Sequence, residues 1–251
     1  MDLGIEGRVA LVMGASRGIG RGVAAALARE GARVAIASRS RERLEEAASE
    51  IEGETAIVTA DTNDLERLAQ LPADVERALG PVEILVANTG GPPPGRALDH
   101  GVDEWQRAYR SLVLAPRVLV GAALPRMREC GWGRIVNVAS TSVREPIPTL
   151  ALSNAHRGAT LGFFKTLARE LAAEGITVNT LAPGRIATDR AAELAGGSMD
   201  EVERRAREEV PAGRPGTPEE CGDLVAFLCS QRASYLTGAL IPLDGGLMRS
   251  L

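Results

Sequence analysis

Seven short runs of β-branched and other apolar residues alternate with longer stretches that carry apolar residues at helical spacing. The runs are Arg8–Val12, Arg33–Ala37, Thr55–Thr59, Glu83–Ala87, Arg134–Val138, Thr177–Leu181 and Ala239–Pro242. This alternation predicts parallel strands joined by right-handed crossovers, with helices on both faces of the sheet. Apolar strands of this kind fit a sheet that is buried on both sides. We therefore expect an α/β fold with a seven-stranded parallel sheet.

The chain has no visible linker and no internal repeat across its 251 residues. That length suits one domain with a sizeable core, so we expect a single domain over residues 1–251. Residues 187–214, between the sixth and seventh strands, are charged and have little strand pattern. We interpret this segment as a helical flap over the site, and a plain pair of solvated surface helices is the alternative.

The net charge, the N-terminal residues and the cysteines bear on which partners and which location we expect for the protein. The net charge is −4, and no clustered basic stretch indicates a nucleic-acid partner. The first residues are polar and the apolar run Val9–Met13 is short, which predicts neither a signal peptide nor a membrane span. The three cysteines are far apart and form no metal-ligand pattern. These features predict a cytoplasmic protein without a metal site.

A glycine-rich loop follows the first strand and opens a helix. Its glycines permit a tight turn and let the backbone approach a pyrophosphate, while the helix N-terminus offers N–H donors and a positive dipole end. The loop therefore predicts a dinucleotide site between strand and helix. Its predicted cofactor contacts are Gly14, Ser16, Arg17, Gly18, Ile19 and Gly20.

The end of the second strand bears on the choice of cofactor. An acidic residue there would bind the ribose hydroxyls of NAD, but the strand ends in Ser38 and Arg39. These two side chains, together with Arg17, offer a hydroxyl and guanidinium groups that suit a 2′-phosphate. NADP(H) is therefore favoured over NAD, and arginines that merely point into solvent are the alternative.

The motifs together resemble the short-chain dehydrogenase/reductase family, in particular its members similar to 3-oxoacyl-[acyl-carrier-protein] reductase. The likeness covers essentially the whole chain and implies a single-domain Rossmann fold that transfers a hydride between nicotinamide and a carbonyl or alcohol carbon. The matching segments, in family order, are the glycine loop, Asp61-Thr62, Asn88-Thr89-Gly90, Gly133–Asn137 before Ser140, Ile176–Asn179, Pro183–Thr188, Tyr235–Gly238 and Asp244–Gly246.

The resemblance also implies roles for particular residues. Asp61 and Thr62 would hold the adenine, and Asn88 and Gly90 would pass beneath the cofactor ribose. The loop that begins at Pro183 and Gly184 would fix the nicotinamide carboxamide through Ile186 and Thr188. Family members are commonly homotetramers, so the resemblance implies a tetramer or dimer built on helices 103–127 and 153–173 and the C-terminal segment.

The proton-donor machinery of the family is altered in this sequence. The family uses a tyrosine, a lysine four residues later, a serine thirteen residues before the tyrosine, and an asparagine on an earlier helix. The register places Ser153 at the tyrosine and Arg157 at the lysine, retains Ser140, and places Leu112 at the asparagine. An arginine stays protonated at neutral pH and leucine cannot hold a relay water. The sequence thus predicts an intact cofactor cradle and a lost proton path.

Two hypotheses follow for the function. In the first, Ser140, Ser153 and Arg157 form the catalytic set and stabilise a developing alkoxide, while water or the substrate delivers the proton. In the second, the chain is a non-catalytic NADP-binding protein that acts as a sensor or scaffold.

Two further features stay open. His156, one helical turn from Ser153, is an alternative acid, and with Ser140 it would give a hydrolase pair that lacks a third member. The stiff loop Gly90–Gly95, with three prolines, is interpreted as a wall of the substrate site or as a rigid connector.

Overall fold

The computed structural model describes residues 1–250, so the last residue of the predicted domain, Leu251, lies outside it. All seven strands pair in parallel in one sheet of order β3-β2-β1-β4-β5-β6-β7. The predicted α/β fold with a seven-stranded parallel sheet is confirmed, and each strand end lies within two residues of its predicted position. The strands are β1 Val9–Met13, β2 Arg33–Ser38, β3 Thr55–Thr59, β4 Ile84–Ala87, β5 Gly133–Val138, β6 Ile176–Pro183 and β7 Leu240–Leu243.

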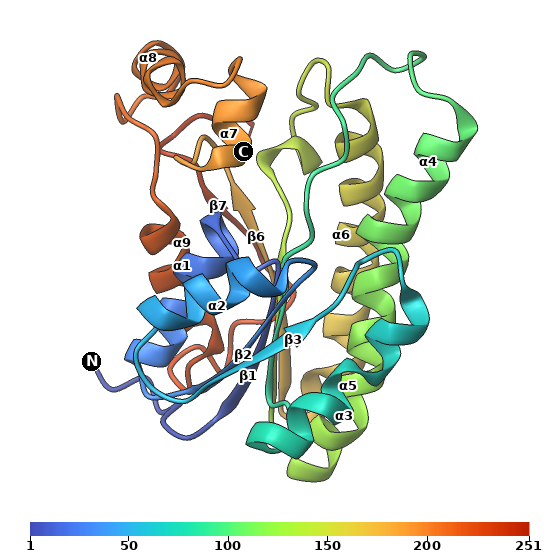
Figure 1. The fold of residues 1–251 in the computed structure, drawn as a ribbon, viewed down its shortest axis with the longest axis vertical. Coiled ribbons are helices and arrows are strands. Elements are labelled where there is room, and N and C mark those ends of the chain that lie inside the picture. Colours follow the sequence, from blue (N-terminus) through green and yellow to red (C-terminus); the bar gives the residue numbers. More distant parts are fainter. Residues whose placement is uncertain (251) are drawn as a thin grey trace.

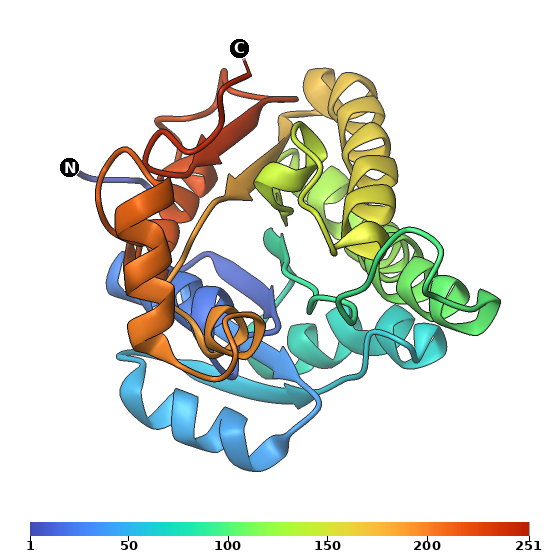
Figure 2. The same cartoon turned by 90° about the horizontal axis from the view of Figure 1, so that it is seen from above.

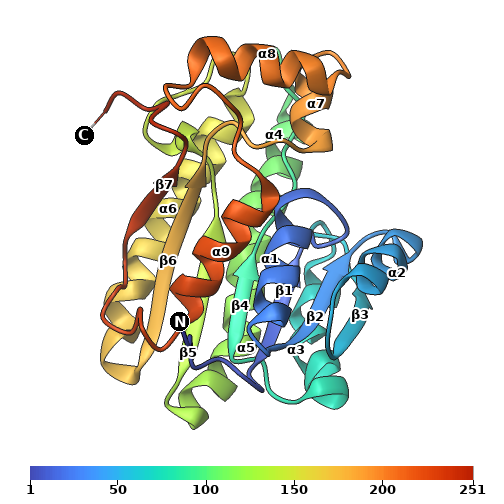
Figure 3. The ribbon, with the colours of Figure 1, turned by 90° about the vertical axis from the view of Figure 1, so that its left-hand side faces the viewer.

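Helices cover both faces of the sheet. In Figures 1 and 3, α1, α2 and α9 lie on one face, and α3, α5 and α6 lie on the other. The helices are α1 Gly18–Arg29, α2 Arg41–Glu50, α3 Leu65–Leu79, α4 Val102–Tyr109, α5 Ala115–Cys130, α6 Ala151–Leu171, α7 Asp189–Leu194, α8 Met199–Glu209 and α9 Pro218–Cys229. Among residues 1–250, no helix combines the length and the apolarity that crossing a bilayer requires.

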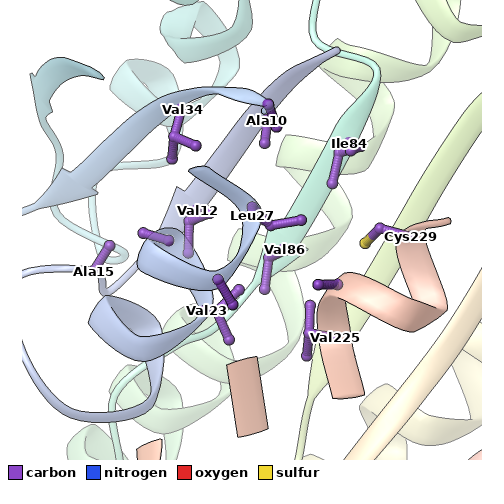
Figure 4. Close-up of a cluster of buried hydrophobic side chains, with 14 of the residues drawn as sticks. Ala10, Val12, Ala15, Val23, Leu27, Val34, Ile84, Val86, Val225 and Cys229 are labelled. Carbon is purple, nitrogen blue, oxygen red and sulfur yellow. The ribbon is translucent and has the colours of Figure 1, made fainter. Parts of the chain in front are cut away.

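The side chains of β1 divide between two cores. Successive side chains of a strand point to opposite faces, so Ala10 and Val12 pack under α1 and α9 (Figure 4), while Leu11 and Met13 pack under α3, α5 and α6. All of these side chains are buried. The central strands are therefore apolar on both faces, as their nearly unbroken apolar runs predict.

The strand order places a switch point beside β1. The chain runs from β1 through β2 to β3 on one side, then returns to β4 on the other side of β1. Ligands in open parallel sheets bind outside the carboxyl ends of the strands at such a point. Figure 2 looks onto this edge, and α7 and α8, which lie within the segment 187–214 predicted to be helical, stand over it in Figures 1 and 3.

The adjacent rings of Phe163 and Phe164 on α6 offer a matched test of the core. Phe164 is fully buried against the sheet, whereas Phe163 is partly exposed. We expect Phe164→Ala to lower the free energy of unfolding by about 3–5 kcal/mol through lost burial and a cavity. Urea unfolding should show a clearly smaller loss for Phe163→Ala, and equal losses for the two variants would contradict this account of the core.

Candidate functional site

The glycine loop holds three backbone segments in close contact. Gly14 has a φ of +62°, and a Cβ at this position would lie 2.6 Å from the carbonyl oxygen of Asn88. A Cβ at Gly20 would lie 2.3 Å from the carbonyl oxygen of Gly14. Asn88 Nδ2 donates a hydrogen bond to the same Gly14 oxygen at 3.4 Å. The start of α1, the end of β1 and the segment after β4 therefore meet without room for side chains.

The N-terminus of α1 leaves its backbone donors available. Arg17 precedes the helix in an extended conformation and makes no side-chain cap, and the first turn contains no acidic residue. The first N–H groups of a helix have no partner within the helix, and they carry the positive end of its dipole. A close-packed glycine turn that leads into uncapped N–H groups fits a pyrophosphate. Ser16 lies in the turn itself, and Ile19 lies in the first turn of α1.

The three residues expected around a 2′-phosphate separate in the structure. Ser38 and Arg39 stay together at the end of β2, where Arg39 is exposed. Arg17 instead points to the flap, where its guanidinium binds Asp189 at 3.1 Å and Glu193 at 3.4 Å. Ser38 and Arg39 are thus the side chains at the strand end that suit a phosphate.

The segment after β3 forms a fixed turn at the same edge. Asp61 Oδ1 accepts a hydrogen bond from the backbone N–H of Asn63 at 2.9 Å, and Thr62 lies between them. The turn leads to Asp64, whose side chain caps α3. The position expected to hold an adenine is therefore rigid and lies beside the end of β2.

The loop after β6 is held by the last part of the chain. Pro183 ends β6, and a Cβ on Gly184 would lie 2.7 Å from Cβ of Asp244. Ile186 pairs with Gly216 through backbone hydrogen bonds. Thr188 Oγ1 caps α7 by accepting from the N–H of Ala191 at 3.2 Å. This loop therefore leads from the sheet into the flap with a fixed backbone.

A hollow of about 200 Å³ lies between Ser140, the loop after β6 and the flap. Ser140 Oγ accepts from the N–H of Ser142 at 3.2 Å, so its own proton stays available for a ligand oxygen. The ionisable side chains that line this hollow are arginines. The lining residues are Ile19, Ala139, Ser140, Ile147, Leu150, Pro183, Gly184, Arg185, Ile186, Thr188, Arg190, Ala191, Leu194, Ala195, Val202 and Arg205.

Ser153 and Arg157 form a hydrogen-bonded pair on α6. Ser153 is buried, and its Oγ accepts from Arg157 Nε at 3.2 Å. Arg157 Nη1 donates to the carbonyl of Val138 at 2.8 Å, and Nη2 lies 3.4 and 3.5 Å from the carbonyls of Thr89 and Gly90. This guanidinium thereby ties α6 to the segments that follow β4 and to the end of β5.

Within residues 1–250, no carboxylate lies within hydrogen-bond distance of the Arg157 guanidinium. Burial, followed by the nearby positive charge of Arg190, lowers the pKa of Arg157 to about 10. The side chain is still protonated at neutral pH, and neither Arg157 nor Ser153 is among the residues that line the hollow at Ser140.

Leu112 occupies a π-helical turn, Arg110–Leu114, between α4 and α5. Its side chain is buried, and its backbone carbonyl accepts from Thr160 Oγ1 at 2.7 Å. A π-helical turn displaces carbonyls from their usual helical partners. The carbonyl of Leu112 is bound by the side chain of Thr160, which lies 48 residues later in the chain. The sequence pattern does not reveal this contact.

His156 faces away from Ser140. Its Nδ1 donates to the carbonyl of Leu152 at 2.7 Å, because a carbonyl only accepts. The ring centroids of His156 and Trp105 lie 5.2 Å apart. His156 lines a second hollow, which shares no lining residue with the hollow at Ser140. The structure therefore does not bring Ser140 and His156 together as a pair.

The proline-rich loop is joined to both sides of the site. Gly95 pairs with Leu150, just before α6, through two backbone hydrogen bonds that involve Thr149 and Ala151. On the other side, Arg190 Nη2 donates to the carbonyl of Pro92 at 2.7 Å. Sequence reasoning missed this role of Arg190, and its position two residues after Thr188, at the start of the flap, is the one signal that could have pointed to it.

Comparisons with known proteins identify reductases that are similar to this chain in sequence and in fold. A family model described as enoyl-(acyl carrier protein) reductase matches residues 14–248. The chain is 33% identical over 252 residues to the 3-oxoacyl-[acyl-carrier-protein] reductase of Aquifex aeolicus, covering 98% of this chain and 100% of that protein. It is 37% identical over 227 residues to the inactive 2-(S)-hydroxypropyl-CoM dehydrogenase 2 of Xanthobacter autotrophicus, covering 90% and 99%. The L-sorbose reductase of Gluconobacter frateurii, solved with NADPH and L-sorbose, has a TM-score of 0.92 and 32% identity over both whole chains.

The contact at Gly20 gives a test of the cradle. In Gly20→Ala the new methyl group meets the Gly14 carbonyl, so α1 has to shift away from β1. We expect the Kd for NADPH, measured by fluorescence titration, to rise at least about tenfold, or about 1.4 kcal/mol. Gly121→Ala on α5, whose methyl group meets nothing within 4 Å, is the matched control. Unchanged NADPH binding by Gly20→Ala would place the cofactor elsewhere.

Proposed function

Because the chain belongs to the short-chain dehydrogenase/reductase family, a family of oxidoreductases, we propose that it is an NADP(H)-dependent enzyme that transfers a hydride to a carbonyl compound. We propose that it resembles 3-oxoacyl reductases in its substrate and differs from them in its proton-donor site. The observation that carries this proposal is the hollow at Ser140, which shares its walls with the loop after β6 at the switch-point edge of the sheet.

The residues that would hold NADP(H) fall in order along that edge. When bound, the nicotinamide supplies or accepts a hydride. The preference for NADP rests on Ser38 and Arg39, and NADPH-bound relatives such as the sorbose reductase support it. The full proposed set is Gly14, Ser16, Arg17, Gly18, Ile19, Gly20, Ser38, Arg39, Asp61, Thr62, Asn88, Gly90, Pro183, Gly184, Ile186 and Thr188.

The proposed catalytic residues act on the substrate oxygen. Ser140 has a free hydroxyl proton and donates it in a hydrogen bond to that oxygen. Ser153 Oγ accepts the Arg157 Nε–H, so its own hydroxyl proton stays free to donate. Both hydroxyls then stabilise negative charge on the oxygen, and the protonated Arg157 strengthens this effect through its charge.

The proposal also covers the domain organisation, the oligomeric state and the cellular location of the protein. Residues 1–251 act as one domain, in which segment 187–214 is a flap that covers the substrate. A homotetramer or dimer would use α5, α6 and the C-terminal segment, and the setting would be the cytoplasm. These parts rest on the resemblance to the family and on the place of α7 and α8 over the edge.

A non-catalytic NADP-binding protein is the second candidate. Arg157 commits its N–H groups to Ser153 and to three backbone carbonyls, so it serves as a structural tie whether or not turnover occurs. The Xanthobacter autotrophicus relative of 37% identity, which is named an inactive dehydrogenase, also supports this candidate. Turnover decides between the two candidates, since both predict NADPH binding.

The first test concerns the cofactor phosphate. Arg39→Ala removes an exposed guanidinium from the end of β2, and a hydrogen bond to a charged group contributes about 1.5–3 kcal/mol. We expect the Kd for NADPH to rise by about 10- to 100-fold while the Kd for NADH stays the same. Arg41→Ala, two residues further on and paired with Glu45, is the control. Equal losses for both cofactors would argue against a phosphate contact.

The second test concerns turnover. We expect a broad panel of carbonyl compounds to include at least one that oxidises NADPH, followed by its absorbance. We expect Ser140→Ala to lower kcat for that compound by about 10²–10³-fold, as removal of one oxyanion donor does, without loss of NADPH binding. Tight NADPH binding with no turnover of any compound would instead support the non-catalytic candidate.

A further inference from the structure

The ionisable side chains that line the hollow at Ser140 all carry positive charge. They are Arg185 from the loop after β6, Arg190 from α7 and Arg205 from α8. Within residues 1–250, no aspartate, glutamate, histidine or lysine is among the lining residues. Arginine stays protonated at neutral pH. A molecule in this hollow therefore meets three positive charges in its walls and no negative charge.

Each of these arginines also pairs with a glutamate, and none of the three glutamates lines the hollow. The pairs are Arg185–Glu209, Arg190–Glu193 and Arg205–Glu201. The paired side chains are partly exposed, and exposed ion pairs contribute little because water screens them. These pairs therefore leave the arginines able to bind a second anion from within the hollow.

Arg205 keeps the most unused hydrogen-bond donors of the three arginines. Its Nε donates to Glu201 Oε1 at 2.7 Å, and within residues 1–250 neither of its terminal amino groups has a hydrogen-bond partner. The neighbouring Arg204, which does not line the hollow, spends Nε and both amino groups on Glu201 and Glu208. The planar fork of a guanidinium matches the two oxygens of a carboxylate. Arg205 can therefore bind a carboxylate through two parallel hydrogen bonds.

Ser140 and Arg205 reach the hollow from different parts of the fold. Ser140 follows β5 at the edge of the sheet, whereas Arg205 belongs to α8, which stands farther from the sheet than α7 in Figures 1 and 3. Leu150, Leu194 and Val202 line the same hollow with apolar side chains. A molecule that binds both Ser140 and Arg205 thus needs an oxygen at one end, an anionic group at the other and an apolar segment between them.

The size of the hollow limits the length of that molecule. The hollow has a volume of about 200 Å³, below the range of about 300–1,000 Å³ that is common for pockets of drug-sized ligands. Its walls also include Ile186 and Thr188, which belong to the proposed nicotinamide site. The space left beside the flap is therefore small and suits a short substrate better than a long acyl chain.

We infer that, within the proposed reduction of a carbonyl compound on which this inference rests, the substrate is a small oxo acid whose carbonyl oxygen lies at Ser140 and whose carboxylate binds Arg205. Arg185 and Arg190 add positive charge to the walls. Charges attract more strongly where apolar side chains keep water away, so the hollow favours an anion over a neutral molecule of the same shape. Arg205 thereby selects the substrate and takes no part in the hydride transfer.

The substrate test compares oxo acids with neutral analogues of the same length. The acids 4-oxopentanoate, 5-oxohexanoate and 6-oxoheptanoate, and the amide of each, are incubated with NADPH, and initial rates are followed by its absorbance. An amide keeps the shape of a carboxylate and lacks its charge. We expect kcat/KM for at least one acid to exceed that for its amide by about tenfold or more, as the loss of a charged hydrogen bond implies.

Two variants on one helix test the role of Arg205. We expect Arg205→Gln to raise KM for the preferred acid by about 10- to 100-fold, while kcat for the acid and KM for its amide stay the same. Arg204→Gln, which loses ion pairs to Glu201 and Glu208 on the same helix but lines no part of the hollow, should keep the preference for the acid. The Kd for NADPH should be unchanged in both variants.

A binding test examines the carboxylate site without turnover. The protein is loaded with NADP⁺, which has no hydride to give, and is titrated with the same three acids and amides by calorimetry. We expect the preferred acid to bind at least about tenfold more tightly than its amide, and we expect Arg205→Gln to remove this difference.

The outcomes separate the substrate assignment from the proposed function. Equal kcat/KM for acids and amides, a preference that survives in Arg205→Gln, or turnover of other carbonyl compounds alone would overturn the inference and leave the oxidoreductase function standing. Weaker NADPH binding by Arg205→Gln would assign this arginine to the cofactor and overturn the inference as well. If no compound oxidises NADPH that the protein binds, the proposed function fails, and the calorimetry still decides whether Arg205 binds a carboxylate.

Discussion

Parallel pairing of all seven strands is the constraint on which the site depends. Because every strand runs the same way, every carboxyl end lies at one edge, and the segments after six of the strands meet there. The contact between Gly14 and Asn88 is the tightest point of this meeting. Any change that separates β1 from β4 would thus disturb the glycine loop and the segment under the proposed ribose position together.

The positions at which we expect an altered proton-donor site each have defined contacts in the structure. Arg157 extends a planar fork to a serine and to backbone carbonyls, where a lysine would offer a single point charge. The backbone carbonyl of Leu112 accepts a hydrogen bond from Thr160 Oγ1, and its apolar side chain offers no group that could bind a water molecule. The proposed replacement of a proton path by fixed donors and charge would thus alter the chemistry at this edge and leave the glycine loop in place.

Much of this could be predicted from the sequence, for local reasons. The strand runs are apolar and evenly spaced, and the glycine loop lies directly between a strand and a helix, so short segments define both features. The positions of Ser153 and Arg157 follow from counting along one helix. Arg17 is different: its side chain is long, and its acidic partners on the flap lie more than 170 residues away.

The partners of His156 and Arg190 could not be predicted from the sequence either. Helical spacing placed His156 within a turn of Ser153, but only packing against Trp105 decides that its ring faces the other hollow. Arg190 binds a carbonyl 98 residues earlier in the chain, and no periodicity encodes such a partner. Side-chain contacts between distant segments are set by the assembled sheet, which is why the cradle was more predictable than the chemistry beside it.

The attachment of the flap has a consequence for its mechanics. Its base is fixed by backbone pairing between Ile186 and Gly216, whereas its contacts with the phosphate loop are exposed ion pairs from Arg17. Dissolved ions weaken exposed charge pairs and leave backbone hydrogen bonds nearly untouched. Strong salt therefore weakens the link between α7 and the phosphate loop, while the pairing between Ile186 and Gly216 keeps the start of this segment in register with the rest of the fold.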